Sequence, residues 1–175
     1  MGSCSSTDLI DKHDQNSLLS TSDIILLRNS WREIVHQGQE KFAVEFMVRL
    51  FTIYPNFKHL WWFLKDVNTE ENLRNNSQVL VHGQKMFDAI DKSIYSLEDI
   101  NSCCFALINL GRIHFKIGVR EEHFKLTLNL KPIYEVLTMT LADGLGENFD
   151  NKTKNCWKKF LTFIECQMKI GFEKN

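Results

Sequence analysis

The nine residues "VLVHGQKMF", from Val79 to Phe87, contain the feature that decides the fold, a histidine on an apolar face. Val79, His82, Met86 and Ala89 follow one another in steps of three and four, the spacing of one face of an α-helix. His82 therefore points in the same direction as three apolar residues, toward whatever this helix packs on. A histidine in that position is either a core residue with a hydrogen-bond partner or a ligand.

A second histidine occupies the same kind of position. "SLED" at residues 96–99 fits a capping box, and the helix it opens carries an apolar stripe that ends on His114. Neutral imidazole binds iron, copper and zinc, and a haem iron takes one axial ligand from each side. Apart from Cys103 and Cys104, which we expect to pack, no thiolate or carboxylate shares either stripe, as a zinc site would require. The pattern favours a flat apolar cofactor with a nitrogen above and below it.

The remainder of the chain is expected to be helical. It has eight glycines and two prolines, and strand-like alternation of any length is missing from it. Apolar stripes predict helices over 23–36, capped by a hydroxyl among residues 20–22, over 39–54, and from residue 150 or 151 to the end. The expected buried faces are Ile24, Leu27, Trp31, Ile34 and Val35 in the first and Ala43, Phe46, Met47, Leu50 and Phe51 in the second. The polar stretch 65–76 is expected to be irregular. Ser77 is expected to cap the helix that carries His82. Pro132 either kinks a helix or begins one. We predict an all-α fold of seven to eight helices.

Composition narrows the class of protein. A chain of 175 residues is most simply one domain, and its net charge of −1 offers no field to attract nucleic acid. No apolar run approaches the roughly 20 residues needed to span a bilayer. Five cysteines without CxxC pairs indicate a reducing, intracellular compartment.

The first 21 residues differ from the rest and are expected to form a flexible tail. They fit the pattern M-G-x-x-x-[ST], with Gly2 as a site for myristate, and Cys4 stands where palmitate could be added. Two chains would anchor the protein stably at a membrane. The interpretation is then a cytoplasmic protein at the inner face of the plasma membrane, and the alternative is a plain disordered tail.

Five landmarks in the right order make residues 22–172 resemble the globin family, with 173–175 as a short C-terminal tail. They are "SW" at Ser30–Trp31, Pro55, "HGQK" around His82, "LGRIHFKIGV" around His114, and Trp157. The resemblance implies a globin fold around haem b, with His114 as the proximal iron ligand and His82 on the distal side. The interval of 32 residues between the histidines and the acylation-like tail resemble the neuroglobin, globin X and nematode globin groups. Those groups imply that both histidines bind the iron.

The resemblance also implies which residues line the pocket. Trp61 takes the place of a phenylalanine that stacks on the porphyrin, with Phe63 as the alternative. Lys85 either reaches a haem propionate or is a solvated helix lysine. The other expected pocket residues are Met47 and Met86 on the distal side, and Leu110, Val119 and Phe124 on the proximal side.

Three functions are compatible with this pattern. The first is a haem protein that binds O2, NO or CO, or that exchanges single electrons with a partner protein; bis-histidyl ligation would favour redox signalling over oxygen storage. The second is a helical interaction module without haem, its pocket filled by large side chains. The third is a metal hydrolase, for which a third ligand and a base are missing. A dedicated enzymatic activity does not follow from the sequence.

Overall fold

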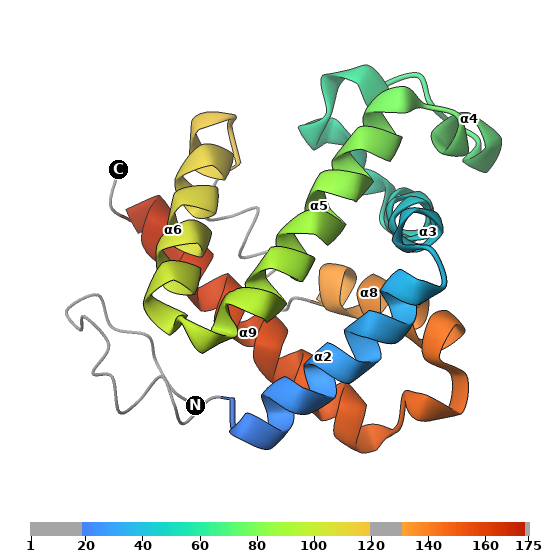
Figure 1. Ribbon diagram of the computed structural model, residues 1–175. Coiled ribbons are helices and arrows are strands. Elements are labelled where there is room, and N and C mark those ends of the chain that lie inside the picture. The colour runs from blue at the N-terminus through green and yellow to red at the C-terminus, as the bar shows by residue number, and fades with distance from the viewer. Residues whose placement is uncertain (1–18, 120–130, 174–175) are drawn as a thin grey trace.

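The computed structural model describes residues 19–119 and 131–173, and all its regular elements there are helical (Figure 1). This confirms the prediction of an all-α fold. The α-helices are α2 (Thr21–His36), α3 (Gln39–Ile53), α4 (Glu70–Arg74), α5 (Ser77–Tyr95), α6 (Ile100–Lys116), α8 (Lys131–Leu145) and α9 (Asn151–Glu173). Short 3-10 segments join them: η1 (Pro55–Leu60), η2 (Trp62–Leu64), η3 (Ser96–Glu98) and η4 (Gly146–Asn148). None of the described helices combines the length and the hydropathy that crossing a bilayer requires.

The core is built around two tryptophans from opposite ends of the sequence. The rings of Trp31 in α2 and Trp157 in α9 lie 5.8 Å apart, and Phe87 of α5 packs 5.5 Å from Trp31. All three side chains are fully buried. Each indole N–H finds an acceptor, at Asp91 Oδ1 for Trp31 and at Ser30 Oγ for Trp157. Two large apolar rings are therefore buried without an unsatisfied donor.

Two pairs of helices approach each other through glycines. A Cβ on Gly111 of α6 would lie 2.1 Å from the Met168 carbonyl oxygen of α9, and one on Gly171 would lie 2.1 Å from the Ile108 oxygen. A Cβ on Gly83 of α5 would lie 2.8 Å from the Ala43 oxygen of α3. Only glycine permits these approaches, so α9 fixes the position of α6, and α3 that of α5.

Several expected helix ends are confirmed and others are wrong. Ser20 caps α2 in a full capping box with Asp23, as the hydroxyls of residues 20–22 predicted. The cap of α5 is Asn76 instead of Ser77, since the Asn76 side chain accepts from two backbone N–H groups. Asp99 caps α6 directly, so Ser96 is not the cap residue expected from "SLED".

Three local corrections complete the comparison with the predicted elements. The stretch 65–76, expected to be irregular, contains the short helix α4, which buries Leu73. Pro132 is the second residue of α8, a position where its missing N–H costs nothing, so it begins a helix. Val35 was expected on the buried face of α2 but is 40% exposed.

Candidate functional site

His114 is held in one orientation by its own helix. Its Nδ1 lies 2.8 Å from the carbonyl oxygen of Leu110, one turn earlier in α6. A carbonyl oxygen can only accept, so Nδ1 carries the proton and donates it. In the neutral ring the lone pair is then on Nε2, at the far tip of the side chain. This is the tautomer that a ring needs to bind a metal through Nε2.

His82 in α5 is partly buried, and its ring packs against the indole of Trp61. The Trp61 and His82 rings have centroids 5.3 Å apart at an interplanar angle of 76°. Burial is the main cause that lowers the pKa of His82, and the positive charges of His114 and Lys85 lower it further. His82 is therefore in the neutral form, which is the form that coordinates a metal.

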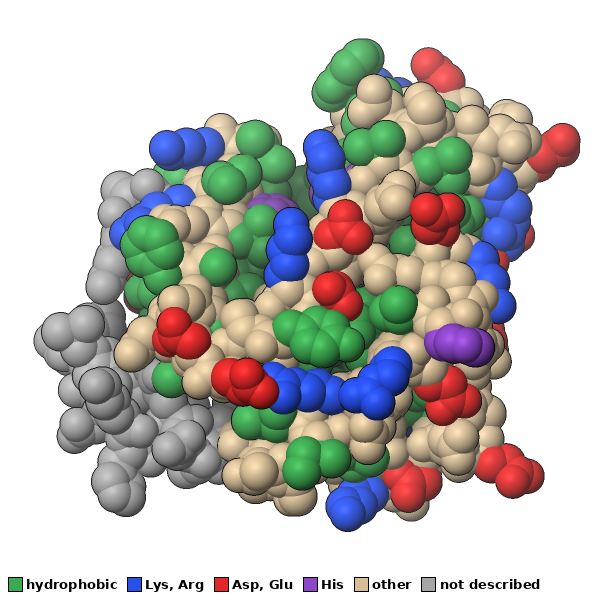
Figure 2. Space-filling model, viewed as in Figure 1, with side chains coloured by type: hydrophobic (Ala, Val, Ile, Leu, Met, Phe, Trp, Pro, Cys, Tyr) green, Lys and Arg blue, Asp and Glu red, His purple; other side chains and the backbone are tan. Residues whose placement is uncertain are grey.

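The two histidines stand on separate helices and close enough to interact electrostatically, since the charge of His114 affects the pKa of His82. Figure 2 shows a hollow in the surface between α6 and α5, with a histidine side chain and apolar side chains inside it. Among the described residues, the His82 ring has no hydrogen-bond partner. One imidazole is thus anchored and the other is available to a ligand.

The structure brings most of the predicted pocket residues close to these histidines or to the core around them. Met47 of α3 is fully buried, and its Cγ would lie 2.9 Å from a Cβ on Gly83, directly after His82 in the chain. Partly buried side chains that pack against the core include four other predicted pocket residues, Trp61, Phe63, Met86 and Leu110. These contacts give both α5, through Met86, and α6, through Leu110, a large apolar side chain that packs against the core.

Trp61 and Phe63 differ in their neighbours. Trp61 lies edge-on to Phe51, with centroids 5.1 Å apart, and to His82. Phe63 has the exposed ring of Trp62 as its aromatic neighbour, at 5.8 Å. The contact with His82 favours Trp61 as the residue that faces the cofactor. Phe51, which supports it, was not predicted as a site residue, although it lies one turn after Met47 on the same apolar stripe.

The remaining predicted residues lie at the margin of the site or outside the described residues. Lys85 is exposed, close enough for its charge to affect His82. The backbone N–H of Val119 donates to the carbonyl oxygen of His114 at 3.0 Å and closes the end of α6. Phe124, Gly2 and Cys4 lie outside the described residues.

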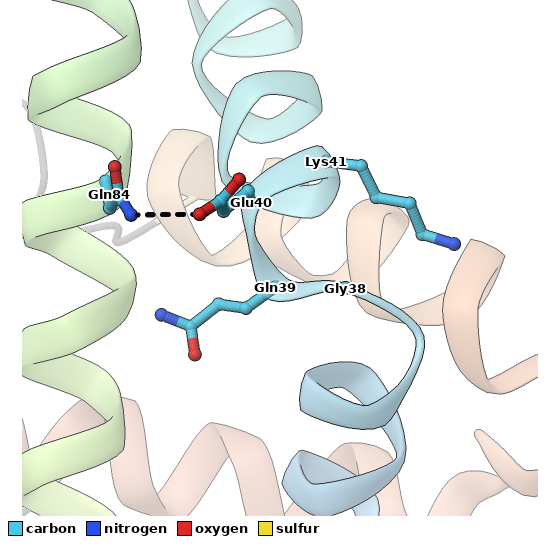
Figure 3. Close-up of a pocket in the computed structure, with 5 residues that line it drawn as sticks. All are labelled: Gly38, Gln39, Glu40, Lys41 and Gln84. Carbon is cyan, nitrogen blue, oxygen red and sulfur yellow. Dashed lines mark hydrogen bonds between the residues drawn. The ribbon is translucent and has the colours of Figure 1, made fainter.

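A separate polar depression lies where α2 meets α3 (Figure 3). In it the Gln84 amide donates to the Glu40 carboxylate at 3.4 Å, and the Gln39 amide donates to Asp88 at 3.0 Å. Both of its glutamine amides therefore already have carboxylate partners. It contains neither histidine, and we do not consider it a cofactor site.

The residues of the hollow fit haem better than a bare metal ion. Within residues 19–119 and 131–173, no three His, Cys, Asp or Glu side chains gather as a metal-ion site of protein ligands would require. Two imidazoles on separate helices, each a side chain that can bind a metal through a ring nitrogen, would instead suit an iron that is held in a porphyrin. The apolar side chains around His82 match the face of a macrocycle. The donor set and its surroundings are thus those of a haem pocket.

Comparison with known proteins agrees with this geometry. The chain is 31% identical to an anaerobic nitrite reductase of Brassica napus, over 85% of this chain and 89% of that one. It is 26% identical to neuroglobin of Tetraodon nigroviridis, over 90% of this chain and 94% of that one. A hexacoordinated haem protein from an anhydrobiotic tardigrade has the same fold, with a TM-score of 0.77 over 89% of this chain and 96% of that one, at 20% identity.

The family model described as Globin matches residues 44–168, which include most of α3, all of α5 and α6, and both histidines. This match covers more than half of the sequence, and it begins and ends within helices of the described fold. The chain belongs to the globin family of haem-binding proteins.

Proposed function

We propose that His114 and His82 are the two axial ligands of the haem iron, and that the protein uses this centre to bind a diatomic gas or to exchange single electrons. The observation that carries the proposal is the pair of partly buried imidazoles on α5 and α6, of which His114 is fixed by Leu110 and His82 has no hydrogen-bond partner among the described residues. When bound, the haem supplies reversible one-electron chemistry and an iron that takes O2, NO or CO.

Each histidine has a distinct task in this proposal. His114 anchors the iron, and its Nδ1–H bond to Leu110 keeps the ring in a single tautomer. His82 would hold the iron from the side that a gas ligand needs, so a gas would bind only to the fraction of molecules in which His82 is not bound. Bulk oxygen storage is disfavoured under this condition, whereas electron exchange does not require His82 to leave. We therefore place redox signalling before storage.

The absorption spectrum of the purified, haem-loaded protein tests the proposal. Sharp, split visible bands in the dithionite-reduced form are expected, as two nitrogen ligands produce them, and His82→Leu should replace them with the broad band of five-coordinate iron. Leu80→Ala, two residues away on an exposed part of α5, is the matched control and should leave the spectrum unchanged. A five-coordinate spectrum in the unaltered protein would contradict bis-histidyl ligation and return oxygen storage to first place. Failure to take up haemin would support the haem-free module.

The cofactor is proposed to be haem b, held only by its iron ligands and by apolar contacts. Among the described residues, no cysteine stands beside His114 in the C-x-x-C-H pattern of covalent attachment. Extraction with acidified acetone should therefore remove all of the colour. Colour that stays with the protein would contradict this assignment.

The N-terminal tail is proposed to attach the protein to the inner face of a membrane through myristate on Gly2 and palmitate on Cys4, within the cytoplasm. The sequence pattern supports this proposal. Cells that express the full chain should transfer an alkyne-labelled myristate to the protein, and Gly2→Ala should abolish the label. Cys4→Ser should keep the myristate and lose membrane retention in fractionation. An unlabelled protein would leave a plain tail as the interpretation.

A further inference from the structure

Two consecutive tryptophans lie in opposite environments. The ring of Trp61 is partly buried and contacts His82 with centroids 5.3 Å apart. Trp62 is 81% exposed, the highest fraction among the large hydrophobic side chains in the described residues. The backbone is extended at Trp61, with φ −122° and ψ 101°, and turns into η2 at Trp62. The chain thus directs one indole to the pocket and the next to solvent.

Tryptophan side chains are normally buried to a large extent, so an indole that is exposed to water requires an explanation. Trp62 also has a defined place, because its ring lies edge-on to Phe63 with centroids 5.8 Å apart and an interplanar angle of 86°. A residue that only had to be polar and solvated would not need an indole there.

We propose that Trp61 and Trp62 form a one-electron path from the haem pocket to the surface, with Trp62 as the point where an external reductant delivers electrons. This inference rests on the proposed binding of haem between His82 and His114. Indole is among the side chains that lose an electron most easily, whereas a phenylalanine ring does not do so under the same conditions. Consecutive Cα atoms are about 3.8 Å apart, so the two indoles are attached to neighbouring points of the backbone, one directed to His82 and the other to solvent.

The reaction that would use this path is the reduction of a hydroperoxide ROOH at the haem. Two molecules of a reductant AH and one ROOH give two radicals A•, one ROH and one H2O, which balances two electrons and two protons. Each electron passes from AH to Trp62, from Trp62 to Trp61, and from Trp61 to the pocket. An indole that has lost an electron releases its ring N–H proton to solvent or keeps it, and it recovers its starting form when the next electron arrives.

Tyr95 provides an internal comparison. It is the other strongly exposed oxidisable ring in the described residues, at 46%. It lies at the end of α5, and the guanidinium carbon of Arg28 stands 5.9 Å from its ring centroid. A nearby positive charge disfavours the loss of an electron from the ring. Exposure alone therefore predicts label on both rings, with less on Tyr95, whereas the path predicts that the label on Trp62 also requires haem and Trp61.

The test traps the radical on the protein in the absence of any reductant. Ferric haem-loaded protein receives one equivalent of hydrogen peroxide and a nitroso spin trap, and fragmentation of the peptides assigns the adduct to individual residues. We expect about tenfold more adduct on Trp62 than on Tyr95, and Trp61→Phe to lower the Trp62 adduct by about tenfold. Trp62→Phe should remove the adduct from residue 62, and Trp62→Tyr should restore it, because tyrosine is oxidisable.

Three results would overturn the path. The first is labelling of Trp62 to the same extent in protein with and without haem. The second is an amount of Trp62 adduct that does not change in Trp61→Phe. The third is labelling of Tyr95 to the same extent as Trp62. If Trp61→Phe does not take up haem, the comparison of haem-loaded with haem-free protein, together with the Trp62 variants, decides. Protein that never acquires a haem spectrum contradicts the proposed function, whereas a haem-loaded protein whose Trp62 stays unlabelled contradicts only the path.

Discussion

Gly83→Ala is the substitution that most directly tests how the fold positions the site. Gly83 follows His82 in the chain and lies where α5 crosses α3. The added Cβ would lie 2.8 Å from the Ala43 carbonyl oxygen and 2.9 Å from Met47 Cγ, whereas ordinary contact begins at 3.4 Å. The helices must therefore separate by about 0.6 Å, since neither a backbone oxygen nor a fully buried methionine can give way cheaply.

The expected loss of stability follows from two opposing effects. Overpacking of this size costs about 1–3 kcal/mol, and replacing a helical glycine with alanine returns about 0.5–1 kcal/mol. The net fall in the free energy of unfolding should lie between about 0 and 2.5 kcal/mol, with a midpoint of about 1.3 kcal/mol, or roughly 3–5 °C in Tm at that midpoint for a chain of this size. Guanidinium unfolding followed by circular dichroism measures it, with the variants compared at the same haem load.

The same displacement should change the iron. Because His82 moves with α5, the iron bond that we propose for it should weaken, and the reduced haem-loaded protein should show more five-coordinate iron and faster CO binding. Val81→Ala, at an exposed position on the other side of His82, is the control and should change neither quantity. An unfolding free energy and a spectrum both equal to those of the unaltered protein would refute the close approach of α3 and α5.

Three further predictions concern other contacts. Ser30→Ala leaves the buried indole N–H of Trp157 without its acceptor at 3.0 Å, so the unfolding free energy should fall by about 1–3 kcal/mol in the same titration. Burial raises the pKa of Cys104 and of Cys156 to about 11, so roughly one thiol in a thousand is ionised at pH 8. Iodoacetamide should therefore alkylate the two only after unfolding, and a mass shift in the folded protein would contradict this. In protein prepared without haem, the pKa of His82 is lowered from 6.5, chiefly by burial, so the unfolded state binds a proton that the folded state does not. Stability should be full above pH 6.5 and fall below it by at most about 1.4 kcal/mol per pH unit, until the pH reaches the folded pKa. Denaturant titrations at several pH values should show this slope, and His82→Leu should reduce it.

The sequence predicted the helices with long apolar stripes because burial on one face enforces a period of 3.6 residues. All five residues of the stripe in α3 are buried as expected, Ala43, Phe46, Met47, Leu50 and Phe51. The same reasoning made His82 and His114 candidates for the site, since each continues such a stripe. Periodicity therefore indicates which residues face inward, and a polar residue that shares the stripe becomes a candidate for the site.

The features that the sequence did not predict depend on tertiary contacts. Helix α4 has too few residues for a period, and it is held in place by buried Leu73 and by the ion pair of Arg74 with Glu45 at 2.8 Å. Asn76 and Ser77 are both good cap residues, and only the extended backbone at Asn76, with ψ 114°, decides between them. The glycine after His82 was visible in the sequence, but its contact with the backbone of α3 was not.

Both histidines are placed by contacts of the backbone more than by contacts of side chains. His82 precedes Gly83, where α5 meets the backbone of α3, and His114 follows Gly111 by one turn, where α6 meets the backbone of α9. Backbone contacts cannot relax by a change of rotamer, so the separation of the two helices, and with it that of the imidazoles, is a property of the fold. Side chains such as Met86 can change shape without moving either helix. Affinity for the cofactor should therefore depend on the pocket side chains, whereas the choice between one and two histidine ligands should depend on the glycines.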